Sequence, residues 1–91
     1  MSMKRIIEEK LTTRFEPDWL EVLDESTNHN VPRGAESHFR VTVVSDGFGD
    51  QKLLARHRAI NATLADELAG QVHALAIHAY TPEEWQARNG T

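Results

Sequence analysis

The clearest strand pattern in the chain is HFRVTVVS, residues 38–45. Apolar and polar residues alternate in it, as they do in a strand with one buried face. The two faces are Phe39, Val41 and Val43 on one side, and His38, Arg40 and Thr42 on the other. An apolar sheet face must be covered by another layer, so this stretch predicts the sheet around which the chain folds.

The sequence before this strand predicts a helix, a strand and a loop. Apolar residues recur every fourth position near the N-terminus, as on one face of a helix: Met3, Ile7, Leu11 and Phe15. Pro17 ends this helix. Residues 18–25 alternate as a strand does, and residues 26–34 contain the small polar residues, proline and glycine of a loop.

The sequence after this strand predicts a turn at 46–50, a helical segment, a third strand and a last helix. The helical segment carries seven residues at helical spacing: Leu53, Leu54, His57, Ile60, Asn61, Leu64 and Leu68. We expect two helices here, with a bend near Arg58, ended by Gly70. Residues 72–80 read as the third strand, and residues 81–84 as a capping box that opens a short helix carrying Trp85.

The predicted order is therefore α-β-β-α-α-β-α, an α/β (α+β) fold in one domain spanning residues 1–91. We expect the helices to cover one face of a three-stranded sheet.

Composition excludes several functional classes. The net charge of −4 argues against binding nucleic acid by bulk electrostatics alone. The chain has no cysteine, so it offers neither disulfides nor thiolate ligands. No apolar run approaches the roughly 18 residues of a membrane span, and charge rather than an apolar stretch follows the N-terminus. These features predict a cytoplasmic protein that does not enter membranes.

Catalysis is not indicated either. Two pairs of adjacent glutamates, at 8–9 and 83–84, splay apart on helices, so neither makes an acid–base dyad. The serines lack a glycine elbow, and residues 46–49 lack the length and lysine of a phosphate-binding loop. The sequence predicts a protein that is not an enzyme.

The five histidines are the feature that most needs explanation. His57 falls on the inward helical face, where we expect a packing role. His73 and His78 are five residues apart in a strand, so they point to opposite faces and cannot share a site. His73 and His38 each open a strand, and His29 lies in the loop. No zinc signature is present, so spacing alone leaves a metal site unassigned.

The one local basic cluster consists of Lys52, Arg56 and Arg58. Arg56 and Arg58 are about 200° apart around a helix, so not every charge can face one partner. The cluster either contacts phosphates or a protein, or it only solvates the helix and pairs with Asp66 or Glu67.

Several stretches together resemble the BolA-like family: GAESHFRV at 34–41, VVSD at 43–46, LARHRAIN at 54–61, LADEL at 64–68 and VHALAI at 72–77. The similarity runs from about Ile6 to Trp85. The resemblance implies the α-β-β-α-α-β-α order, similar to a type II KH domain. It implies two roles: partnership with a monothiol glutaredoxin in iron–sulfur and iron homeostasis, and DNA binding as a transcriptional regulator of cell shape and stress response.

The resemblance also implies which residues serve these roles. In the glutaredoxin complex the family shares a [2Fe–2S] cluster with the partner's cysteine and glutathione, and no cluster is expected on this chain alone. The family's C-terminal histidine falls on His73. The second ligand comes from the loop, which here resembles the histidine branch of the family, so His29 is the carry-over and His38 the alternative. If DNA is bound, Lys52, Arg56 and Arg58 are the expected phosphate contacts.

Overall fold

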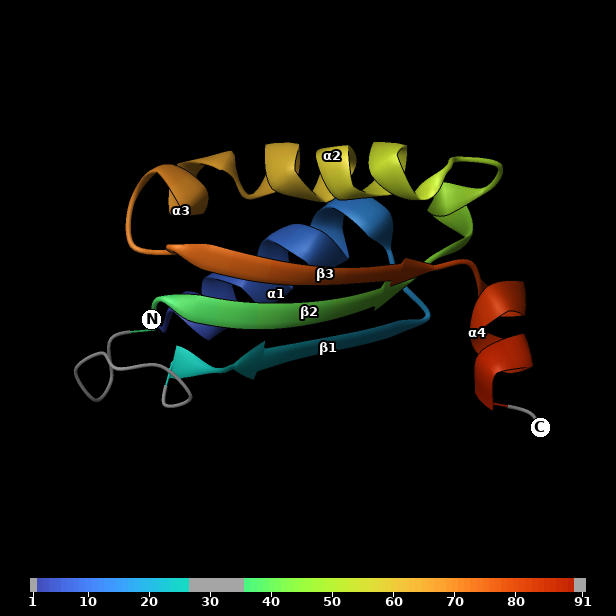
Figure 1. The fold of residues 1–91 in the computed structure, drawn as a ribbon, viewed down its shortest axis with the longest axis horizontal. Helices are drawn as coiled ribbons and strands as arrows, with labels where there is room; N and C mark the ends of the chain where they lie inside the picture. The colour runs from blue at the N-terminus through green and yellow to red at the C-terminus, as the bar shows by residue number, and fades with distance from the viewer. Residues whose placement is uncertain (1, 27–35, 90–91) are drawn as a thin grey trace.

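The computed structural model describes residues 2–26 and 36–89, and Figure 1 shows its fold. The elements are α1 (Met3–Phe15), β1 (Trp19–Asp24), β2 (His38–Val44), a 3-10 turn (Asp46–Phe48), α2 (Leu53–Thr63), α3 (Ala65–Ala69), β3 (Ala74–Tyr80) and α4 (Pro82–Asn89). This order confirms the predicted α-β-β-α-α-β-α arrangement. No helix in the described ranges has the length and apolar character that crossing a bilayer requires.

The three strands form one mixed sheet in the order β1-β2-β3. β1 pairs antiparallel with β2, and β2 pairs parallel with β3. His38 lies opposite Ala74, so β2 and β3 begin at the same end of the sheet, where β1 also ends. We call this the loop end, defined by Ser26, Ser37 and His73.

The face of the sheet that carries the apolar side chains is covered by α1 and α2 (Figure 1). The buried core contains Val22, Phe39, Val41, Val43 and Ala79 from the strands and Ile7, Leu11, Phe15, Ile60 and Leu64 from the helical side. The alternation in residues 38–45 therefore predicted the buried face correctly, because Phe39, Val41 and Val43 all lie in the core.

The ends of α1 follow the expected chemistry. The Ser2 side chain accepts a hydrogen bond from the Arg5 N–H at 3.2 Å, which satisfies one free donor of the first turn. At the other end Glu16 adopts a left-handed conformation with φ of 45°, and Pro17 follows it.

The inward face of α2 differs from the prediction. Leu53 and Leu54 are each 61% exposed, whereas Arg56 and Ile60 are buried. The segment also breaks later than expected, at Leu64 rather than near Arg58. Leu64 is 1% exposed. The break therefore lies at a buried residue. The side of α2 that faces the core is the one that carries Arg56, not the one that carries Leu53 and Leu54.

The last helix, α4, does not pack on the same face of the sheet as α1 and α2. We call the face of the sheet opposite α1 and α2 the open face. The Trp85 ring of α4 stacks on Trp19 with centroids 6.3 Å apart, and lies 5.4 Å from the Tyr80 ring. Trp19 and Tyr80 have the strand parity of the open face, so α4 packs there by aromatic contact. The expectation that all helices cover one face is wrong for α4.

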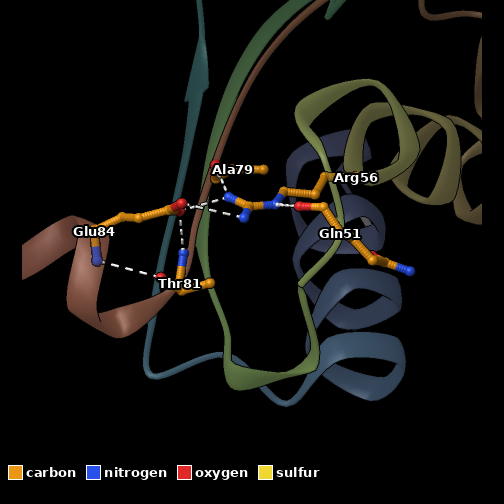
Figure 2. A network of polar contacts seen from close by, with 5 residues as sticks. All are labelled: Gln51, Arg56, Ala79, Thr81 and Glu84. Atoms are coloured by element: carbon orange, nitrogen blue, oxygen red, sulfur yellow. Dashed lines mark hydrogen bonds and ion pairs between the residues drawn. The ribbon is translucent and has the colours of Figure 1, made fainter. Parts of the chain in front are cut away.

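Arg56 holds α2, β3 and α4 together (Figure 2). Its guanidinium donates to the Gln51 carbonyl at 2.8 Å, to the Ala79 carbonyl at 3.2 Å and to both oxygens of Glu84 at 2.5 and 3.2 Å. Glu84 also accepts the Thr81 N–H at 2.8 Å and donates its own N–H to the Thr81 hydroxyl, which completes the predicted capping box. We call these five residues the Arg56 clamp.

The clamp makes the free energy of unfolding depend on pH in the acidic range. The hydrogen bond from Arg56, assisted by the Thr81 N–H, lowers the pKa of Glu84 from 4.5 to about 2. A carboxyl with a lower pKa in the folded state stabilises the protein above its unfolded pKa and loses that effect as pH falls. We expect the difference in unfolding free energy between wild type and Glu84→Gln to shrink between pH 4.5 and about 2. Urea unfolding at a series of pH values measures it, and a constant difference contradicts the prediction.

Candidate functional site at the loop end

His73 is exposed and stands immediately before β3. Val72, which was expected to begin this strand, is buried in the connection from α3, and its N–H donates to the Glu67 carbonyl at 2.9 Å. The N–H groups of His73 and Ala74 both donate to the Ser37 carbonyl, at 2.7 and 3.2 Å. The backbone of His73 is thus fixed while its imidazole faces solvent.

Two buried serines join the ends of segment 27–35. The Ser26 hydroxyl oxygen accepts hydrogen bonds from the Ser37 N–H at 2.9 Å and the His38 N–H at 3.2 Å. Ser26 donates its own N–H to the Asp24 carboxylate at 2.9 Å. Because Ser37 also holds His73, the segment between β1 and β2 begins and ends beside the candidate ligand.

The two other histidines considered for this site stand differently. His38 is half-buried at the start of β2, with its Nδ1 atom 2.9 Å from the Ser37 hydroxyl, so that nitrogen already has a hydrogen-bond partner. His29 lies outside the described residues. The structure therefore fixes where the neighbouring chain ends lie, and the assignment of the second ligand stays a prediction.

The donor set determines what this end of the protein can hold. An exposed imidazole is a ligand for borderline and soft metals. Within residues 2–26 and 36–89, no three His, Cys, Asp or Glu side chains are grouped to hold a metal ion, and the sequence has no cysteine. A stable site needs about four ligands. The described residues alone do not complete such a site, so a metal site here would need ligands from outside them.

The basic cluster is split by the fold. Lys52, the residue before α2, and Arg58 within α2 are exposed, but Arg56 is only 5% exposed and engaged in the clamp. Arg56 therefore cannot be the surface cation that the sequence suggested. The alternative pairing was also wrong, because Asp66 and Glu67 pair with Lys10, at 3.9 and 2.7 Å, and Glu67 raises the pKa of Lys10.

The remaining histidines lie away from the loop end. His57 is half-buried on α2. His78 is exposed in the middle of β3 with the parity of the open face, opposite Thr42.

Sequence reasoning missed the positioning role of Ser26 and Ser37. Ser26 was assigned only to the loop and Ser37 was given no role, yet they are 2% and 4% exposed. The available signal was their placement, one on each side of a proline- and glycine-containing loop, where a hydroxyl can satisfy backbone N–H groups.

Ser26→Ala is expected to lower the free energy of unfolding by about 1–3 kcal/mol, because it leaves two N–H groups without their acceptor. Urea unfolding measures the change. Thr12→Ala, which removes an exposed hydroxyl from α1, is the control and should shift stability by less than about 0.5 kcal/mol. Equal effects of the two substitutions would show that the Ser26 hydroxyl does not organise this end.

Comparison with known proteins agrees with this architecture. The family model described as "BolA-like protein" matches residues 11–84. The chain is 60% identical to the "DNA-binding transcriptional regulator BolA" of Vibrio cholerae, over 92% of this chain and 79% of that protein. It is 54% identical to the protein of the same name in Escherichia coli, over 100% of this chain and 87% of that one.

A solved structure extends the agreement to three dimensions. The BolA domain of SufE1 from Arabidopsis thaliana superimposes with a TM-score of 0.86 at 43% identity, covering 92% of this chain and 96% of that one. The names of these relatives describe regulators or BolA-like proteins and no enzyme. With the family model and the fold in agreement, this chain belongs to the BolA-like family.

Proposed function

We propose that this protein is a non-enzymatic partner of a monothiol glutaredoxin, with which it shares a [2Fe–2S] cluster in cytoplasmic iron–sulfur and iron homeostasis. The observation that carries the proposal is the exposed imidazole of His73, which is held through Ser37 beside the segment that contains His29. The partner's cysteine and glutathione would supply the other ligands, as the donor set of this chain requires.

The protein's own contribution would be to hold His73 in position for the partner. The serine contacts fix the backbone on both sides of the loop, so His73 is presented without a large ordering cost. Imidazole ligands in place of thiolates make such a cluster less negative and raise its reduction potential. His73 is therefore the residue through which this chain would tune the shared group.

Mixing is the test. When the purified chain is added to a cluster-loaded monothiol glutaredoxin with glutathione, the visible absorption and circular dichroism of the cluster should change in a saturable way. Addition of the Lys52→Gln variant, altered far from the loop end, should give the same change. Spectra that stay those of the glutaredoxin alone would remove the proposal.

DNA binding is the second candidate, favoured by the names of the two bacterial relatives and by two exposed cations, Lys52 just before α2 and Arg58 on α2. Two cations on an acidic protein predict modest, strongly salt-dependent affinity. Duplex DNA should be retarded in a gel at low salt, and Lys52→Gln with Arg58→Gln should abolish the shift. Lys4→Gln, at an exposed position of α1, is the control. A shift that survives the double substitution would reject this surface.

A further inference from the structure

The open face carries a hollow that neither proposed role uses. Its volume is about 260 Å³, and it lies between strand side chains and α4. Its lining combines apolar Leu23, Tyr80 and Trp85 with charged Glu21, Arg40 and Arg88. Pockets for drug-sized ligands are usually roughly 300–1,000 Å³, so this hollow matches a smaller unit.

Aromatic rings form one wall of the hollow. The Tyr80 and Trp85 rings are 5.4 Å apart and tilted by 46°, and the next ring in the row, Trp19, is 49% exposed. Open sheet faces that bear aromatic side chains bind unpaired nucleobases by stacking, and such stacking tolerates any base. The wall therefore suits a flat aromatic ligand.

The cations suit a phosphate beside that base. The Arg88 guanidinium lies 5.4 Å from the centre of the Tyr80 ring, and it pairs with no carboxylate in the described part of the chain. Arg40 is 3.2 Å from Glu25 but keeps 48% of its side chain exposed. On a chain with a net charge of −4, these two arginines make a local site for an anion.

Glu21 narrows the choice of ligand. Its exposed side chain lines the same hollow as the two arginines, so the ligand must offer a hydrogen-bond donor as well as an anionic group. A carboxylate accepts hydrogen bonds from exocyclic amino groups such as those of cytosine. A ligand that carries both an amino-bearing base and a phosphate satisfies every charged group of the hollow.

We infer that the open face binds a nucleotide, with its base against Tyr80 and Trp85 and its phosphate at Arg88 and Arg40. The nucleotide is either free or one unit of a single strand. This inference rests on neither proposed function: the glutaredoxin proposal concerns His73, and duplex binding concerns Lys52 and Arg58.

Two probes distinguish a free nucleotide from a single strand as the ligand. AMP is titrated into the labelled protein and followed by amide chemical shifts, and fluorescein-labelled hexadeoxyadenylate is followed by anisotropy. Shifts clustered at Thr42, His78 and Tyr80 with AMP mean that a free nucleotide suffices. Saturable binding of the hexamer with weak AMP binding means that the strand is the ligand. The hexathymidylate strand, which lacks amino groups, should bind more weakly than hexadeoxyadenylate.

Arg88→Gln should weaken binding about fivefold and reduce its salt dependence, as expected for loss of one phosphate contact. Lys4→Gln, a matched loss of charge at an exposed position of α1, should leave binding unchanged. Amide spectra establish that both variants fold. The inference is overturned if neither probe binds at millimolar concentration, if Arg88→Gln binds as wild type does, or if an acidic hexapeptide occupies the hollow instead.

Discussion

His73→Ala is expected to abolish the spectral change that the wild-type chain causes in a cluster-loaded monothiol glutaredoxin. The substitution removes the one exposed imidazole at the loop end within the described residues, while the backbone hydrogen bond to Ser37 needs no side chain. Folding should therefore be unaffected, and the loss should be one of ligation. Visible circular dichroism at a fixed excess of the variant measures it.

Matched histidine variants make this result specific. His78→Ala removes an equally exposed imidazole from the open face and should behave as wild type does. His29→Ala should weaken the change more than His38→Ala does, because His29 is the predicted second ligand and His38 the alternative. Retention of the full change in His73→Ala would show that the partner does not use this ring.

Arg56→Leu is expected to lower the free energy of unfolding by about 2–4 kcal/mol. It keeps an aliphatic side chain but strips the carbonyls of Gln51 and Ala79 and the carboxylate of Glu84 of their donor. For a domain with a stability of about 5–15 kcal/mol this is a large fraction. Urea unfolding followed by far-ultraviolet circular dichroism measures the change.

Arg58→Leu provides the comparison, because it makes the same chemical change two residues away at an exposed position. It should alter stability by less than about 0.5 kcal/mol. The two substitutions also separate structure from nucleic-acid binding: Arg56 acts through folding, whereas Arg58 remains available to a partner. Similar destabilisation by both would contradict the assignment of Arg56 to a clamp.

The order of elements and the buried sheet face were predictable because both depend on local patterns. The alternation in residues 38–45 and the apolar residue at every fourth position of α1 indicate directly which side chains face the core. The same rule failed on α2, where it favoured Leu53 and Leu54. A buried arginine has no signature in hydropathy, since its burial depends on Glu84, which is 28 residues away in the sequence.

The candidate site was predictable only in part for a similar reason. Residue type and family resemblance pointed to His73, which the structure places exposed beside the loop ends; its role as a ligand stays a prediction. The serine contacts that position it join Ser26 to Ser37 and Ser37 to His73, across strands whose register cannot be read from sequence. The aromatic packing of α4 on the open face likewise depends on where Trp19 and Tyr80 come together.

The parallel pairing of β2 with β3 has a consequence for biosynthesis. The chain leaves the sheet after Val44 and returns only at Ala74, through two helices on one side. While the protein emerges from a ribosome, β2 has one unoccupied edge and Ser37 has no His73 to hold. The loop end is completed only when β3 has been synthesised, so the hydrogen bond between His73 and Ser37 forms only when the domain is nearly whole.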